Sequence, residues 1–224
     1  MIKLDLQRFG GRGGDGSSLS NGGNNKPSQI FNEEDVWSYR HNKNNEAFVD
    51  NINGAARDVQ RDFPDLMTDI NNIQTGEFGG IESQTVLGCW TSDGDLIMNK
   101  NYTNVQKMNS VYDKAVETGY HPSRGNKTGT EAVTYHELGH ALTEHVSTKA
   151  GTKGIDATAM KIVNDAYQNG GFKGGTKYFA GKISGYAQEN YAECIAEAVA
   201  DVYCNGSKAK KQSKAIMTEL KKYK

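Results

Sequence analysis

Two histidines separated by three residues, in the segment His136-Glu137-Leu138-Gly139-His140, constrain this chain more than any other feature. Four residues advance a helix by about 400°, so the two imidazoles would lie about 40° apart on one helix face and could share a metal ion. Histidine pairs at this spacing, with a glutamate directly after the first, are typical of zinc-binding helices in which the glutamate acts as a general base. The pattern therefore predicts a zinc-binding helix on which Glu137 accepts a proton from water.

The residues around this motif favour a helix that is buried on one side. Thr128 or Thr130 could cap its N-terminus. Gly139 lowers helix stability, and a helix interior seldom contains glycine without a packing reason. We therefore expect another part of the chain to approach the backbone closely at Gly139. The apolar positions that would form the buried stripe are Val133, Leu138, Ala141 and Leu142.

Two histidines leave a catalytic zinc site incomplete, because such sites usually have three protein ligands and one open position. The extended pattern HExxHxxGxxH is excluded, since Thr143 and Val146 occupy the places of its glycine and third histidine. His145 follows His140 by five residues and would point away from the ligand face, so we expect it to face solvent or to support the site indirectly. A carboxylate further along the chain is the remaining candidate.

The segment from residue 184 to 201 offers such carboxylates at every fourth position, which would place them on one face of a helix. Like charges at this spacing repel one another unless a cation or another partner compensates them. A solvated acidic stripe is the alternative interpretation, although apolar Cys194, Ile195 and Val199 predict that the opposite flank is packed. The four candidates are Glu189, Glu193, Glu197 and Asp201.

This segment resembles the glutamate helix of the gluzincin metallopeptidases, in the branch related to anthrax lethal factor. That branch has the pattern Tyr-x-x-x-Asn-x-x-Glu-x-x-Ala-Glu-Ala downstream of His-Glu-x-Gly-His. The resemblance covers residues 80–204 approximately. The residues that match the pattern without a gap are Tyr186, Asn190, Glu193, Ala196, Glu197 and Ala198.

The resemblance implies an α+β, zincin-like fold with a small mixed sheet, an edge hairpin, an active-site helix and a glutamate helix. It implies one catalytic Zn²⁺ held by His136, His140 and Glu193, with Glu137 as general base. By the same resemblance, Tyr186 donates a hydrogen bond to the developing oxyanion, and Glu197 orients a zinc-bound histidine. The register is chosen because only Glu193 has a tyrosine seven residues upstream. The implied activity is hydrolysis of peptide bonds in a protein or peptide substrate.

Between these motifs the sequence predicts two strands, residues 84–90 and 95–99, joined by a turn that contains Asp93-Gly94. The resemblance implies that the edge strand of this hairpin pairs with the extended substrate. Helices are expected at 105–116 and around 161–167, the second ended by Gly170-Gly171. Residues 119–129 read as a long loop with His121 at the surface, and residues 171–185 as an irregular wall of the cleft.

We expect four segments along the chain: a disordered leader with a glycine-rich linker (1–28), a helical region (29–78), the zincin-like domain (79–206) and a basic C-terminal helix (207–224). The helical region would pack on the catalytic domain or dock onto a partner. The first ten residues resemble the leader of structural proteins of phages and prophages. This resemblance implies a phage-encoded protein whose partners include particle proteins. A virion structural or interaction protein that keeps a zincin fold without catalysis is the alternative function.

Composition excludes several functions. A net charge of -1 gives no general affinity for nucleic acid or membranes, and the lysines of the C-terminal helix predict a solvated face. No stretch predicts a membrane span or a secretory signal, so we expect a location in the bacterial cytoplasm or on the virion. Salt-sensitive DNA binding through residues 207–224 is a weaker third reading. The three cysteines lack metal-site spacing and read as reduced, buried thiols: Cys89, Cys194 and Cys204.

Overall fold

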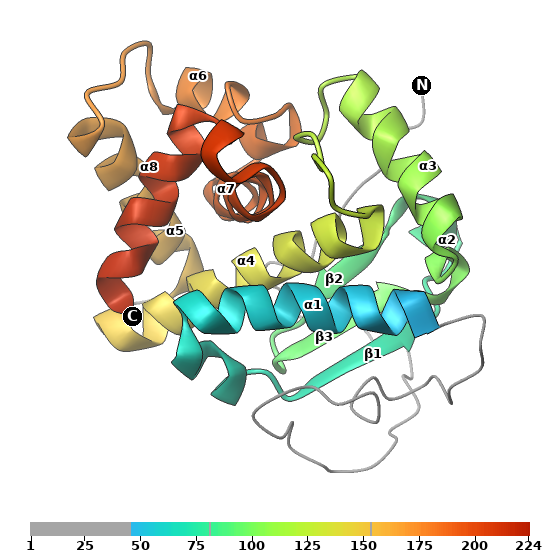
Figure 1. The fold of residues 1–224 in the computed structure, drawn as a ribbon. Coiled ribbons are helices and arrows are strands. Elements are labelled where there is room, and N and C mark those ends of the chain that lie inside the picture. The colour runs from blue at the N-terminus through green and yellow to red at the C-terminus, as the bar shows by residue number, and fades with distance from the viewer. Residues whose placement is uncertain (1–45, 81, 153) are drawn as a thin grey trace.

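The helix that carries the two histidines, α4 (Gly129–Ala150), runs through the middle of the molecule (Figure 1). The computed structural model describes residues 46–224 apart from 81 and 153, and only the backbone of 82 and 83. The predicted leader and linker (1–28) and the beginning of the predicted helical region lie outside the described residues. Most residues of α4 are buried, because other elements cover it on several sides.

Local chemistry defines both ends of α4. Thr128 caps its first turn, and its side chain accepts a hydrogen bond from the Glu131 backbone while the Glu131 side chain accepts one from the Thr128 backbone. Of the two predicted caps, Thr128 is therefore the cap and Thr130 lies inside the helix. Gly151 ends the helix in the left-handed conformation, with φ of 60°, which glycine adopts without steric cost.

A three-stranded sheet lies beside α4, with strand order β1-β3-β2. β3 (Asp95–Asn99) pairs antiparallel with β2 (Gly88–Trp90), as the predicted hairpin requires, and Gly94 provides the turn with φ of 78°. The first strand is shorter than predicted because residues 82–85 form the short helix α2 (Glu82–Thr85) instead. The Trp90 indole donates a 2.8 Å hydrogen bond to Glu144, which fixes β2 against α4.

The region before residue 79 is not a separate helical unit. It contains α1 (Glu46–Asp62) and the 3-10 helix η2 (Pro64–Thr68), and then β1 (Asn72–Gly76), which no sequence signal predicted. β1 pairs parallel with β3, so one sheet crosses the predicted division between residues 78 and 79. The correction has a physical reason: parallel pairing brings together strands that are distant in sequence, and β1 shows no alternating apolar pattern.

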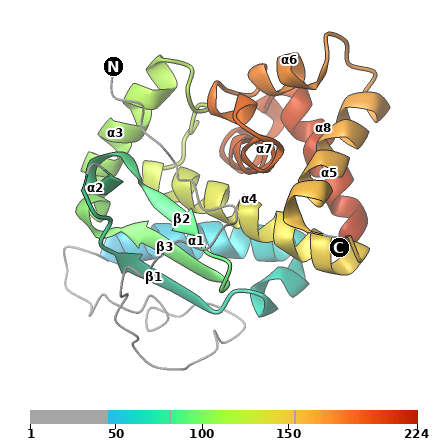
Figure 2. The same cartoon turned by 180° about the vertical axis from the view of Figure 1, so that it is seen from behind.

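α1 packs beside α4 and covers one face of the sheet. Figure 1 shows α1 in front of the sheet, and in Figure 2, seen from behind, the sheet lies in front of α1. The prediction that a helix from this region packs on the rest of the fold is thus confirmed for residues 46–62. Its apolar residues recur at helical spacing and are buried in the core: Phe48, Val49, Ile52, Ala55, Ala56 and Val59.

The C-terminal half of the described chain is helical and packs on the other side of α4. α7 (Tyr191–Asn205) crosses α4, while α5 (Ile155–Asn169) and α8 (Lys211–Leu220) pack against α7 (Figure 1). The predicted helices near 105–116 and 161–167 are confirmed as α3 (Val105–Glu117) and α5. Residues 171–185 are less irregular than expected, since they contain α6 (Thr176–Gly181). Four short 3-10 helices complete the described chain: η3 (Lys100–Tyr102), η4 (Tyr186–Gln188), η5 (Gly206–Lys208) and η6 (Lys221–Tyr223).

The molecule is therefore a mixed α+β fold, mostly helical, with one three-stranded sheet among its described residues.

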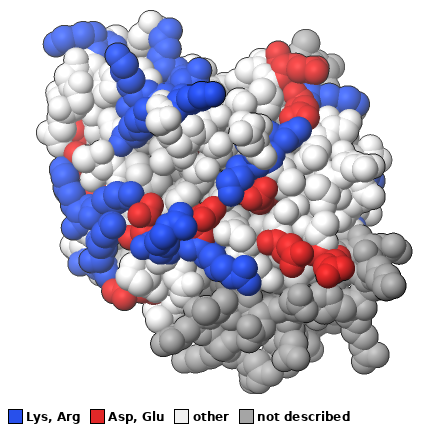
Figure 3. Space-filling view, viewed as in Figure 1, with Lys and Arg blue, Asp and Glu red and all other residues white. Residues whose placement is uncertain are grey.

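The lysines of residues 207–224 are exposed while Ile216, Met217 and Leu220 are buried, so the predicted C-terminal helix packs through one face only. Figure 3 shows Lys and Arg side chains on the side of the molecule where α8 lies. Within the described chain, no helix has both the length and the apolar character that a membrane crossing requires.

Candidate metal centre

The two histidines of α4 and one glutamate of α7 converge on a single point. His136 Nε2 lies 3.2 Å from His140 Nε2 and 3.2 Å from Glu193 Oε2, and His140 Nε2 lies 3.4 Å from Glu193 Oε2. His136 and Glu193 are buried, and His140 is partly exposed. The structure thus brings together the three residues that the sequence analysis assigned to a metal ion, and this group could hold one.

The spacing of these atoms suits a small tetrahedral cation. Zinc lies about 2.0–2.1 Å from nitrogen and oxygen ligands, so neighbouring ligand atoms in a tetrahedron are about 3.3–3.4 Å apart. The three observed separations match this value. In addition, Glu193 Oε2 is buried without a hydrogen-bond partner among the described residues. An unpaired buried acceptor costs about 1–3 kcal/mol, a cost that a cation would remove.

A close contact between two helix backbones sets the distance between α4 and α7. A Cβ atom added to Gly139 would lie 2.6 Å from Ala196 Cα, nearer than real Cβ atoms approach other atoms. This contact confirms the expectation that something approaches the backbone at Gly139. The Asn190 side chain caps α7 by accepting a 2.8 Å hydrogen bond from the Glu193 backbone, so Glu193 lies in the first helical turn.

Glu197, one turn after Glu193, accepts three hydrogen bonds in the interior. His136 Nδ1 donates to its Oε1 at 2.8 Å, His121 Nδ1 donates to the same oxygen at 3.1 Å, and Ser184 Oγ donates to Oε2 at 2.6 Å. Because Nδ1 of His136 carries the proton of this bond, its Nε2 lone pair is available for a metal ion. Glu197 thus lies on the Nδ1 side of His136.

The charges at the centre depend on one another. Burial lowers the pKa of His136, but its interactions with the Glu193 and Glu197 carboxylates outweigh burial and leave this pKa well above its usual value. Burial raises the pKa of Glu193, yet the charge of His140 and the close contacts with both histidines lower it overall. Burial also raises the pKa of Glu197, and the charge and hydrogen bonds of His121 and His136 lower it to about 2. The two carboxylates are therefore anionic at neutral pH.

Glu137 lies between the histidines in sequence and faces β2. Its Oε1 is buried without a hydrogen-bond partner among the described residues, and a Cβ added to Gly88 would lie 3.3 Å from it. Burial and the nearby charge of Glu193 raise the pKa of Glu137 to about 7, against the histidine charges and a hydrogen bond from the Trp90 backbone. A side chain at position 88 would therefore crowd the carboxylate beside β2.

Tyr186 belongs to η4 and is buried against the centre. Its ring stacks on the His136 ring, with centroids 5.9 Å apart and an interplanar angle of 21°. Two backbone hydrogen bonds hold its segment, from Gly185 N to Gly119 O at 2.8 Å and from Tyr186 N to Tyr120 O at 3.0 Å. The structure therefore places Tyr186 next to His136.

Two predictions about histidines were wrong. His121 is buried rather than at the surface, because the backbone of residues 119–120 pairs with residues 185–186 and carries it inside. His145 does not face solvent, since it is buried and bonded to Asp69, beyond η2 and away from the ligand group. The sequence analysis also missed Ser184. No local signal marks His121 or Ser184, since neither belongs to a periodic pattern. Both bond to Glu197, which follows His121 by 76 residues.

The other two acidic candidates lie elsewhere. Glu189 is exposed and precedes α7, which begins at Tyr191, so it does not share the helix face as predicted. Asp201 is buried and accepts hydrogen bonds from the Asn205 side chain and the Lys210 backbone, which ties α7 to the approach of α8. Neither belongs to the group of ligand atoms, so the geometry favours Glu193 among the four carboxylates.

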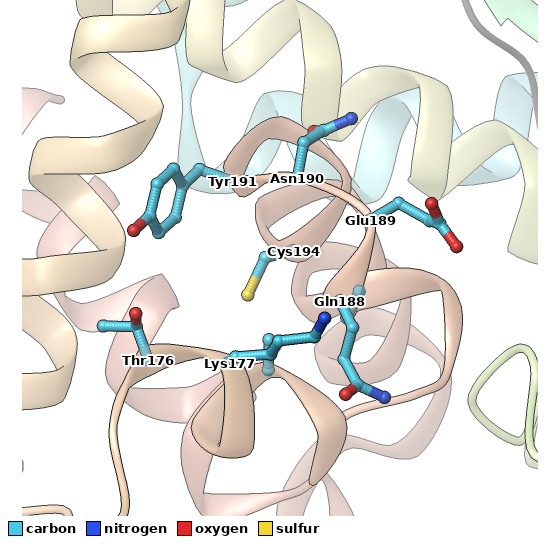
Figure 4. Close-up of a pocket in the computed structure, with 9 residues that line it drawn as sticks. Thr176, Lys177, Gln188, Glu189, Asn190, Tyr191 and Cys194 are labelled. Atoms are coloured by element: carbon cyan, nitrogen blue, oxygen red, sulfur yellow. The ribbon is translucent and has the colours of Figure 1, made fainter.

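A hollow of about 220 Å³ lies near the N-terminal turn of α7, between α6 and η4 (Figure 4). Thr176, Lys177 and Ala180 from the segment that was expected to be irregular form part of its lining. Glu189, Cys194 and Tyr191 line it from the side of α7, so it opens next to the helix that carries Glu193 but on a different face.

Comparison with protein-family models, curated proteins and solved structures found no match to this chain.

Proposed function

We propose that this chain is a zinc-dependent endopeptidase of the gluzincin type with a zincin-like fold. The observation that carries the proposal is the set of three ligand atoms 3.2–3.4 Å apart, contributed by a His-Glu-x-x-His helix and a glutamate on a crossing helix. Two nitrogen atoms and one oxygen atom are a ligand set that zinc accepts, with one position open for water. The sequence motifs and the geometry thus support the same ligand set.

Zinc held by His136, His140 and Glu193 would supply a Lewis acid that polarises a peptide carbonyl and lowers the pKa of water to about 7. The residues around it then have separate tasks. Glu137 takes a proton from the water that attacks the carbonyl carbon and returns it to the departing amine as the C–N bond breaks. Glu197 holds the His136 ring through Nδ1. The products are one carboxylate and one amine.

Two further features support a peptide as substrate. Gly88 and Trp90 of β2 lie against Glu137, so this end strand of the described sheet borders the centre. An extended peptide can add to such an edge through its backbone, which brings a carbonyl close to Glu137. Tyr186, stacked on His136, is the proposed hydrogen-bond donor to the oxygen that becomes negative during attack.

The test measures zinc content and peptide turnover on the same samples. Purified wild-type protein should contain one zinc per chain by elemental analysis and should cleave casein or a mixed fluorogenic peptide library. Glu137→Gln keeps the ligand set and should keep its zinc while losing turnover. A wild-type protein that binds no zinc after reconstitution would contradict the proposal. A zinc-loaded protein that cleaves none of these substrates would favour the non-catalytic alternative.

A further inference from the structure

The buried histidine of the loop before α4, His121, is enclosed by aromatic rings. Its ring stacks on Tyr112, with centroids 5.4 Å apart and an interplanar angle of 11°, and meets Tyr120 and Tyr186 edge to face at 4.9 and 5.5 Å. Its side chain has no exposed surface. The orientation of the imidazole is therefore fixed by packing on several sides.

One nitrogen of this ring is used and the other is not. Nδ1 donates a 3.1 Å hydrogen bond to Glu197 Oε1, whereas Nε2 is buried without a hydrogen-bond partner among the described residues. A ring that served packing alone would be more stable as phenylalanine, since an unpaired buried nitrogen costs about 1–3 kcal/mol. The imidazole at position 121 is thus explained by its Nδ1 bond and not by packing.

The bond from His121 reaches the same oxygen that receives the bond from His136 Nδ1 at 2.8 Å. With Ser184 on the other oxygen, the Glu197 carboxylate is held from two sides and cannot rotate away from His136. Residues that orient a metal-binding histidine in this way set its tautomer and ring direction, and their loss typically weakens metal binding about 10–100-fold. His121 therefore acts on His136 through Glu197.

The segment that carries His121 also holds Tyr186. The backbone carbonyls of Gly119 and Tyr120 accept hydrogen bonds from Gly185 and Tyr186, and the Tyr120 and Tyr186 rings lie 5.0 Å apart. A shift of His121 would consequently move two groups of the centre together: the carboxylate behind His136 and the tyrosine in front of it.

We propose that His121 is a positioning residue of the metal centre, which fixes Glu197 behind His136 and Tyr186 beside it. The proposal rests on the zinc site proposed above. It assigns to residues 119–121 the task of joining the ligand helix α4, the glutamate helix α7 and the tyrosine segment η4 into one rigid unit.

Two substitutions of similar polarity test the proposal in the full chain. In His121→Asn the side-chain amide reaches the place of Nδ1 and can donate to Glu197, whereas in His121→Gln it reaches the place of Nε2 and cannot. Zinc affinity is measured by competition with a chromophoric chelator. We expect affinity to fall about 10–100-fold in His121→Gln and to stay within about threefold of wild type in His121→Asn.

Turnover of the same peptide substrate gives a second readout that a purely structural role would not produce. We expect kcat to fall in His121→Gln with little change in KM, because the substrate does not contact residue 121. Circular dichroism and thermal melting of the metal-free proteins serve as the folding control. If the glutamine chain does not fold, His121→Phe takes its place, since it keeps the ring stack and removes the donor.

Equal zinc affinity in wild type, His121→Asn and His121→Gln would overturn the proposal. So would an equal loss in both variants with intact folding, because shape rather than the Nδ1 bond would then matter. A wild-type chain that binds no zinc would overturn the proposed function and this inference with it. A wild-type chain that binds zinc without cleaving peptides would overturn only the peptidase activity, and the order of affinities would still decide the role of His121.

Discussion

Helix α4 has two polar faces, and they differ in how completely their hydrogen bonds are satisfied. On the face toward α1, the Tyr135 hydroxyl donates to Asp58 at 2.6 Å, and Lys127 Nζ contacts both Asp58 and Glu131 at 3.2 and 3.0 Å. In the metal group, Glu137 of α4 and Glu193 of α7 each keep a buried oxygen without a hydrogen-bond partner among the described residues. The charged groups around Asp58 are thus paired with one another, whereas the metal group has unpaired carboxylate oxygens.

This difference distinguishes groups that stabilise the fold from groups that a ligand or a reaction would use. Buried polar groups that are fully paired stabilise a fold, whereas unpaired ones reduce stability and persist where a ligand or a reaction uses them. Substitutions in the metal group should therefore change metal binding and turnover, and those around Asp58, on the face toward α1, should change stability alone. The predictions below go from the largest expected effect to the smallest.

Removal of Glu193 should have the largest effect. Glu193→Ala takes away the only carboxylate in the group of ligand atoms, so zinc content should fall from one per chain to near zero, and turnover with it. Glu189→Ala is the matched control, because Glu189 is the same residue type four positions earlier but exposed outside the group. Elemental analysis of the zinc content of both proteins shows which of the two glutamates is needed for metal binding. Zinc retained in Glu193→Ala and lost in Glu189→Ala would place the third ligand elsewhere.

Glu137→Gln should lower turnover about 10²–10⁴-fold, which is the usual contribution of a general base. It removes a buried carboxylate that lacks a hydrogen-bond partner for Oε1. The metal-free variant should consequently resist urea as well as the wild type or better, while zinc binding persists. Steady-state kinetics and urea denaturation provide the two measurements. A variant that is inactive because it is less stable would remove the distinction between the two faces.

Gly139→Ala should reduce the free energy of unfolding by about 1–3 kcal/mol, the usual cost of overpacking. The added methyl group meets the backbone of Ala196, which cannot turn aside as a side chain could. Gly54→Ala, in α1, is the matched control: nothing lies within 4 Å of its added Cβ, so it should stabilise the protein by about 1 kcal/mol. Thermal melting of both variants tests the pair. If Gly54→Ala is destabilised and Gly139→Ala is unaffected, the close contact between Gly139 of α4 and Ala196 of α7 is contradicted.

Tyr135→Phe should cost about 1 kcal/mol, because it removes one hydrogen bond to Asp58 while Lys127 and Arg61 still contact that carboxylate. Zinc content and kcat should remain at wild-type values, since Tyr135 lies on the face toward α1, away from the metal group. Urea denaturation and peptide turnover provide the comparison. A loss of turnover larger than the loss of stability explains would show that the α1 face also serves the centre.

Acid should destabilise the α1 face by a small amount. Burial raises the pKa of Asp58, but bonds from Tyr135 and Lys127 lower it below its usual value overall, and the pKa of Asp62 is lowered in the same way by Lys221 and Tyr203. A depressed folded-state pKa gives stability that is present above the unfolded value and lost as pH falls through the folded one. Unfolding measured from pH 6 to 3 should show this loss, and Asp58→Asn should reduce it. Stability that rises toward pH 3 would contradict the sign.

The parts of the centre that obey helical spacing could be predicted from the sequence. His136, Glu137 and His140 lie within five residues, whereas helical spacing left four carboxylates open and only the resemblance to the gluzincin pattern selected Glu193 and Glu197. Gly139 signalled its close contact because glycine is unfavourable inside a helix. Relations within one helical turn are local, so the sequence alone contains them, whereas it did not identify the residue that approaches Gly139.

His121, Ser184 and β1 could not be predicted, because their partners are distant in sequence or unmarked. His121 bonds a carboxylate 76 residues away, and β1 pairs with a strand more than 20 residues later. A histidine before a proline in a polar loop has no periodicity that would indicate burial. Such positions follow from the tertiary packing of several elements at once, and only the structure reveals them.

The separation of the ligands along the chain also has a consequence in time. His140 precedes Glu193 by 53 residues, which ribosomes that add about 5–20 residues per second take about 3–10 s to synthesise. During that interval the histidine pair is present without its carboxylate. The proposed peptidase would therefore acquire its third ligand, and with it its activity, only after synthesis has passed Glu193.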